Sequence, residues 1–216
     1  MNIISNNCIG GYIYTETKTI YNNPFMWTNI LTPDFVNLVN LYSNIDFLNY
    51  NITYEHTGWN DNGDLPKDTL VTTVHIDNLV DVYYTHHLYY SKYDTIHKLA
   101  NGNRLLSNNM EEFVDKKYNS RIQRMIKDNE LPIFIYLEWD YEKESDILLE
   151  NKTDNIIIIS AKYKTAIMPK MEIFNFNDIY PNVKHITPLY GAKWLIKNSK
   201  MLNIHKKKED YNFVKL

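Results

Sequence analysis

The sequence predicts a layered α/β domain with a mostly parallel central sheet flanked by helices. Three observations carry this prediction. Segments with strand-like and helix-like patterns alternate along the chain. The apolar runs at residues 133–137 and 155–159 have no polar face, as expected of strands that are buried on both sides of a parallel sheet. An amphipathic stretch at residues 109–127 has the spacing of a helix that covers such a sheet.

The length and charge of the chain limit its possible organisation. A chain of 216 residues predicts a single α/β domain over residues 1–204, followed by a basic C-terminal tail at 205–216. A formal net charge of −3 provides no basic surface for nucleic acid. The sequence shows neither a signal-peptide pattern nor an apolar run long enough to span a bilayer, so a cytoplasmic protein without a membrane span is expected.

The N-terminal half is expected to contain four strands and one helix. Apolar, β-branched or aromatic residues predict these strands: residues 2–5, 45–56, 70–76 and 79–84. The first strand leads into a predicted loop at residues 5–11, and residues 14–24 are polar and irregular. Thr32 is a natural N-cap ahead of Pro33 and Asp34, so a helix is expected to begin there.

The C-terminal half repeats the alternation of helix and strand. The helix at residues 109–127 follows Asn108, an expected N-cap, and carries an apolar stripe that should face the core. The strands after it are predicted at these positions: residues 133–137, 155–159 and, as an edge strand, 171–176. Residues 141–149 are weakly helical, and residues 191–202 are expected to form the last helix.

The loop at residues 5–11 is the strongest candidate for a ligand site. It combines three small polar residues, the only cysteine and a pair of glycines, which is typical of a loop that approaches another group closely. Ligands of open α/β sheets bind beyond the carboxyl ends of the strands. His86 and His87 also follow a predicted strand. If the two strands are parallel neighbours, Cys8 and these histidines lie at the same edge.

Cys8 is the only possible thiol nucleophile, and a neighbouring imidazole would activate it. His86 or His87 is the expected general base, although adjacent residues on a strand point to opposite faces and only one can serve. Three aspartates are possible orienters of that imidazole: Asp81, Asp94 and Asp140. The alternative is that Cys8 is a small buried hydrophobic residue at the end of the first strand, and that the histidines are structural.

Other candidates are Arg121 and Trp59. A guanidinium at Arg121 would hold an anion such as a nucleotide diphosphate, whereas the alternative is a solvated helix face shared with Lys117 and Arg124. Trp59 could stack on a sugar ring, or simply pack against its neighbours. The sequence lacks the dinucleotide, P-loop, nucleophile-elbow and zinc-ligand motifs, so it indicates no particular cofactor and no metal.

Several segments resemble one bacterial family. Residues 3–14 (IISNNCIGGYIY) are similar to the N-terminal signature of the exopolysaccharide biosynthesis proteins of domain-of-unknown-function family 1919. The resemblance continues at residues 21–26 (YNNPFM), 33–35 (PDF) and 40–41 (NL). It extends more loosely to residues 66–90, to 118–125 (YNSRIQRM) and to the strand at 133–137, with Tyr118 at a position where the family tends to have Trp.

The resemblance implies an α/β domain with a role in surface polysaccharide or glycan assembly. In that setting Asn6 and Asn7 would hydrogen-bond sugar hydroxyls, and Gly10 and Gly11 would admit the substrate. The leading hypothesis is therefore a transferase that modifies a sugar or a sugar nucleotide. A noncatalytic glycan-binding or assembly protein is the first alternative, and a Cys–His hydrolase is the second.

Overall fold

The structure is a computed structural model, which describes part of the chain. The described residues are 2–19, 23–55, 69–91, 96–98, 104–106, 110–128, 131–138, 155–160, 171–175, 179 and 187–203. Trp59 and its predicted loop, residues 141–149 with their predicted weak helix, and the basic tail at 205–216 lie outside these ranges.

A four-stranded parallel sheet with strand order β1-β7-β8-β9 lies at the centre of one half of the fold. Its strands are β1 (Ile3–Ser5), β7 (Ile133–Leu137), β8 (Ile156–Ser160) and β9 (Met171–Asn175). β7 and β8 are buried along their whole length, which explains why neither has a polar face. β9 occupies the edge, as predicted. The layered α/β fold class is confirmed.

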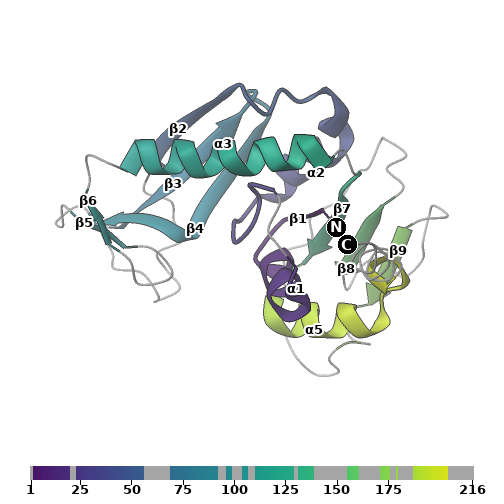
Figure 1. Cartoon of the computed structure of the whole chain (residues 1–216). Coiled ribbons are helices and arrows are strands. Elements are labelled where there is room, and N and C mark those ends of the chain that lie inside the picture. The colour runs from purple at the N-terminus through teal and green to yellow at the C-terminus, as the bar shows by residue number, and fades with distance from the viewer. Residues whose placement is uncertain are drawn as a thin grey trace, which may run out of the picture.

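Alternate residues of these strands point to opposite faces of the sheet and form two separate cores. On one face, Ile3, Ile135 and Ile157 pack with helices α1 (Ile9–Thr17) and α5 (Pro188–Asn198). These two helices contact each other and lie on the same side of the sheet (Figure 1). This face is therefore covered by α1 and α5.

The other face of the parallel sheet packs against a second sheet and two further helices. Ile4, Phe134 and Ile158 share this core with residues of α2 (Thr32–Leu41) and α3 (Met110–Asp128). In Figure 1, α3 runs along the second sheet, with α2 between that sheet and the parallel one. Of the apolar stripe of α3, Tyr118, Ile122 and Met125 belong to this core, whereas Ile126 is 50% exposed.

The second sheet is antiparallel, with strand order β2-β3-β4-β5-β6. Its strands are β2 (Tyr50–Glu55), β3 (Thr69–Ile76), β4 (Val80–Ser91), β5 (Ile96–Lys98) and β6 (Arg104–Leu106). β3 and β4 form a hairpin in which Asp77 and Asn78 adopt positive φ values of 51° and 53°, a conformation that these residue types tolerate. The strand patterns in the sequence do not show whether neighbouring strands run parallel or antiparallel. The sequence therefore did not predict that these strands form a separate antiparallel sheet.

The prediction of a loop at residues 5–11 and of irregular chain at residues 14–24 is partly wrong, because helix α1 covers Ile9–Thr17. Side chains before the helix satisfy its first amide groups. The Ile9 amide donates to Asn7 Oδ1 (3.0 Å), and the Gly10 amide donates to Ser5 Oγ (3.1 Å). Two glycines lower the intrinsic helix propensity of this segment, which is why the sequence did not predict helix α1.

Smaller differences concern where elements begin. The strand predicted from residue 45 starts at Tyr50, after the 3₁₀ helix η1 (Tyr42–Asn44). Thr32 is not the cap of α2: it is the first helical residue, and its hydroxyl hydrogen-bonds the Tyr136 hydroxyl at 3.0 Å. The last helix begins earlier than predicted, at Pro188.

We expect Gly11→Ala to destabilise the protein by about 1–3 kcal/mol, since overpacking a tight contact outweighs the gain in helix propensity of roughly 1 kcal/mol. A Cβ at Gly11 would lie 2.6 Å from the Trp27 ring atoms Cδ2 and Cε2. Urea unfolding measures the effect. In a Trp27→Leu background the cost should shrink, and an equal cost in both backgrounds would contradict the ring contact as its cause.

Candidate functional site

The carboxyl ends of β1, β7 and β8 meet at one edge of the parallel sheet, which we call the carboxyl edge. Ser5 of β1 is in register with Ile135 of β7, and Leu137 of β7 is in register with Ile159 of β8. The residues that follow the strands here are therefore neighbours in space. This is the edge at which open α/β sheets bind ligands.

Asn6 acts as an additional strand residue beside β7. Its side-chain oxygen accepts the Leu137 amide at 2.9 Å, and its side-chain nitrogen donates to the Leu137 carbonyl at 3.0 Å. The side-chain nitrogen of Asn7 donates to the same carbonyl at 3.2 Å. Both asparagines are buried. Their amides are thus engaged by the protein, so they shape the carboxyl edge in this structure rather than present free groups to a sugar.

Glu138 and Ser160 form a buried polar pair at the carboxyl edge. The Ser160 hydroxyl donates to Glu138 Oε2, and the Glu138 amide donates to the Ile159 carbonyl at 3.0 Å. The Glu138 side chain is only 6% exposed, and Ser160 is fully buried. A carboxylate in such a position can accept a proton from a bound hydroxyl or hold a hydroxyl by hydrogen bonding. This pair is the most chemically capable arrangement among the described residues of this edge.

Sequence reasoning missed both members of this pair, although a signal was present. Glu138 directly follows the buried run at 133–137, and Ser160 directly follows four isoleucines. A polar residue at the end of an all-apolar strand of a parallel sheet stands where such sheets bind ligands. Parallel neighbours place both side chains at the same edge.

Cys8 lies at the turn into α1 and is only 3% exposed. Burial raises the pKa of its thiol to about 12, so the group is protonated at neutral pH. A thiol is a poor nucleophile compared with a thiolate. The structure therefore favours the interpretation of Cys8 as a buried apolar residue over its interpretation as a nucleophile.

His86 and His87 were expected at the edge of Cys8 on the condition that their strand is a parallel neighbour of β1. This condition is not met, because both histidines lie within β4 of the antiparallel sheet. Their side chains lie outside the described part of the structure. The Cys8–histidine dyad itself therefore stays a prediction. Asp81, proposed as an orienter, hydrogen-bonds a different histidine, His75.

Gly10 and Gly11 were expected to let a substrate approach the backbone. In the structure they lie in α1 and instead allow close packing by protein groups. A Cβ at Gly10 would stand 2.7 Å from Ser5 Oγ, and one at Gly11 would meet the Trp27 ring. Both glycines are buried. Close packing against Ser5 and Trp27 is therefore a sufficient reason for glycine at positions 10 and 11.

Arg121 does not lie on a solvated helix face, because it is only 7% exposed. Burial raises the pKa of the Tyr84 hydroxyl, and the charge of Arg121 opposes that rise, so the guanidinium stands near this tyrosine in the core under α3. Arg124 on the same helix is exposed. The role of Arg121 as an anion clamp stays a prediction, as does the role of Trp59.

The described residues contain no group of three or more histidines, cysteines, aspartates or glutamates arranged to hold a metal ion. None of the helices described has the length and apolar character that crossing a membrane requires.

No family model and no curated protein matches the chain. The resemblance of residues 3–50 to exopolysaccharide biosynthesis proteins is therefore an interpretation of motifs, and the activity that it implies is a proposal.

We expect the Cys8 thiol of the native protein to react slowly with iodoacetamide near neutral pH and to react fast once the chain is unfolded. His87→Ala should leave the native rate unchanged. The measurement is alkylation followed by intact mass, with and without denaturant. A native thiol that reacts as fast as the unfolded one, and that is slowed by His87→Ala, would restore the dyad.

The same thiol should contribute to alkaline unfolding. Its pKa is raised from 9.0 to about 12, so across this range the folded state retains a proton that the unfolded state releases. The stabilising contribution is complete below the unfolded pKa and is lost as the pH rises through the folded pKa. Cys8→Ala should remove this component of the pH dependence of the unfolding free energy.

Asn6→Ala should lower the unfolding free energy by about 2 kcal/mol or more, because it leaves the buried amide and carbonyl of Leu137 without these partners. Asn37→Ala is the matched control. Asn37 is exposed and makes a single 3.3 Å bond to the Leu79 carbonyl, so a change within about 0.5 kcal/mol is expected. Equal effects of the two substitutions in urea unfolding would contradict the bridging role of Asn6.

Proposed function

We propose that the chain is an enzyme of surface polysaccharide or glycan biosynthesis, a transferase that modifies a sugar or sugar nucleotide at the carboxyl edge. The single observation that carries the location is the buried Glu138 carboxylate, hydrogen-bonded by Ser160 where two parallel strands end. The substrate class comes from the resemblance of the N-terminal signature. Both the Glu138–Ser160 pair and the N-terminal signature concern the carboxyl edge, because the signature contains Asn6 and Asn7, which contact Leu137 there.

Each residue has a distinct role in this proposal. Glu138 accepts the proton of the acceptor hydroxyl as that hydroxyl attacks the transferred group. Ser160 holds one carboxylate oxygen and so orients the base. Asn6 and Asn7 anchor the turn after β1 to β7, with Cys8 buried beside them. The assignments of His86 or His87 as a base and of Arg121 as an anion clamp remain predictions.

The test is an isosteric substitution at the proposed base. Full-length protein is incubated with a panel of uridine and guanosine diphosphate sugars. Binding is followed by ligand-observed NMR, and turnover by nucleotide release. Glu138→Gln should reduce turnover by roughly 100-fold or more while binding persists, since general base catalysis contributes about 10²–10⁴-fold.

Glu172→Gln is the matched control for that experiment. Glu172 lies in β9 of the same sheet, one residue after the strand begins, and its Oε1 accepts the Met201 amide at 2.9 Å. Glutamine retains such an acceptor, so turnover should be unchanged. Equal turnover by both variants would refute the role of Glu138, and failure of every sugar nucleotide to bind would refute the substrate class.

A noncatalytic glycan-binding or assembly protein is the second candidate. The buried, protonated Cys8 favours it over a Cys–His hydrolase, since a hydrolase of that kind needs a reactive thiolate. Binding of glycans without turnover by the wild-type chain would support this second candidate.

A further inference from the structure

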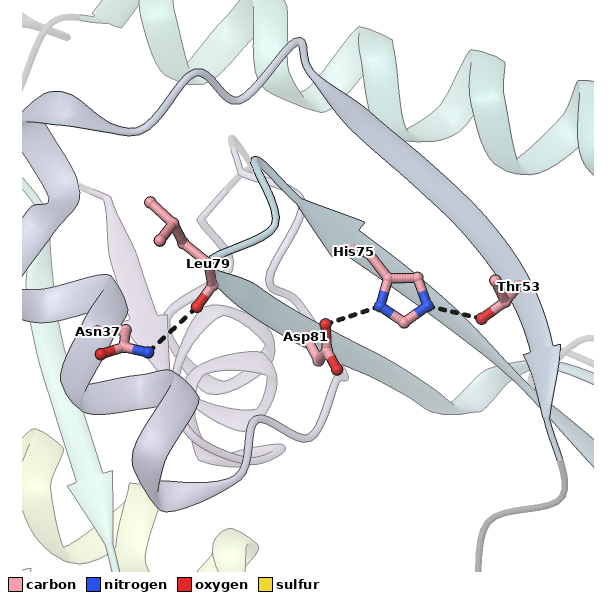
Figure 2. A network of polar contacts seen from close by, with 5 residues as sticks. All are labelled: Asn37, Thr53, His75, Leu79 and Asp81. Atoms are coloured by element: carbon pink, nitrogen blue, oxygen red, sulfur yellow. Dashed lines mark hydrogen bonds and ion pairs between the residues drawn. The ribbon is translucent and has the colours of Figure 1, made fainter.

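The antiparallel sheet carries an acid, an imidazole and a hydroxyl in one hydrogen-bonded line, independent of the carboxyl edge. Asp81 Oδ1 lies 2.7 Å from His75 Nδ1, and His75 Nε2 lies 2.7 Å from Thr53 Oγ1. Figure 2 shows the imidazole between the other two side chains, each contributed by a different strand. Both distances are those of good hydrogen bonds.

The register of the sheet produces this line. The turn at Asp77 and Asn78 places His75 of β3 directly opposite Asp81 of β4. Asn51 of β2 is the residue directly opposite His75, and Thr53 lies two residues further along β2, at a diagonal position that long side chains bridge. The residues between them, such as Val74, belong to the core on the other side of the sheet. The three polar groups therefore share the face turned away from that core.

Two carboxylates stand close to the imidazole of His75. Asp81 contacts the imidazole directly, and Asp34 at the start of α2 stands nearby. Burial raises the pKa of Asp34, the charge of Asp81 raises it further, and a hydrogen bond from the Asp81 amide and the charge of His75 both lower it. Two carboxylates beside one imidazole stabilise the imidazolium that forms when His75 takes a proton from Thr53.

The line is accessible to a ligand at two of its three side chains. The side chains of His75 and Asp81 are 24% and 39% exposed. Thr73 lies directly opposite Thr53 on the same face, but it is fully buried and therefore out of reach of a ligand in this structure.

We propose that Thr53, His75 and Asp81 form an acyl-transfer site for small neutral esters. Thr53 Oγ attacks the ester carbonyl carbon while its proton passes to His75 Nε2. The carbon–oxygen bond to the alcohol then breaks, and the alcohol leaves with that proton. Water attacks the acyl-threonine with His75 as base, and this releases the carboxylic acid and regenerates Thr53. Asp34 and Asp81 repel anionic esters, which is why the substrate is neutral.

The test uses the full chain and p-nitrophenyl acetate as the probe. We expect p-nitrophenolate release and, after acid quenching, a single acetyl group on the peptide that contains Thr53. Thr53→Val and His75→Gln should abolish the adduct, and Asp81→Asn should slow release by roughly 100-fold or more.

Thr72→Val is the control, because it makes the same substitution on the opposite face of β3 and leaves the line intact. Its rate should equal that of the wild type. Circular dichroism melting of every variant separates loss of fold from loss of chemistry. Release that persists in folded Thr53→Val would overturn the proposal. So would changes in melting temperature alone, with no acyl adduct in the wild type, which would show a purely structural network.

Discussion

Asn6 is the residue through which hydrogen bonds connect the two sheets of the fold. It pairs with both main-chain polar groups of Leu137, at 2.9 and 3.0 Å, and so extends the β1–β7 pairing by one position. The carbonyl of Asn6 accepts the Ile30 amide at 2.8 Å, and Asn29 exchanges two 2.8 Å bonds with Tyr83 of β4. A continuous set of hydrogen bonds thus joins the parallel sheet to the antiparallel one.

This connection explains why the motif around Asn6 is so dense in polar residues and yet so buried. Ser5, Asn6 and Asn7 all lie in the interior, where an unpaired polar group would be costly. Each of them has a partner in the main chain. The glycines that follow leave room for Ser5 and Trp27. The motif thus connects β1 to β7, and Glu138 directly follows the end of β7.

Two polar arrangements with different physical settings result from this architecture. At the carboxyl edge, Glu138 and Ser160 are almost completely buried, so their chemistry depends on what enters beside them. On the antiparallel sheet, His75 and Asp81 remain partly exposed and are aligned by cross-strand register. The first setting suits a substrate enclosed at strand ends, whereas the second suits a small ligand that approaches an open sheet face.

Sequence reasoning located most elements because their signals are local. The uninterrupted apolar residues at 133–137 and 156–159 indicated buried strands, and the stripe that includes Tyr118 and Ile122 indicated a buried helix face. It failed for α1, where Gly10 and Gly11 weaken the helical pattern and the capping groups of Ser5 and Asn7 come from a turn. It also failed for Arg121, because charge at a helical position does not show which face a neighbouring sheet will cover.

The amino-acid sequence by itself therefore determined the fold class, the order of most strands and helices (α1, β5 and β6 excepted), and the importance of the segment around Asn6, all of which follow from local pattern and composition. Only the tertiary structure decided strand direction, and with it which polar groups meet. The structure places His86 and His87 in a different sheet from β1. It brings His75 into hydrogen-bonding distance of Asp81 and Thr53, and Ser160 into hydrogen-bonding distance of Glu138. The physical reason is that such meetings depend on the pairing of strands far apart in the chain, and residue spacing carries no record of that pairing.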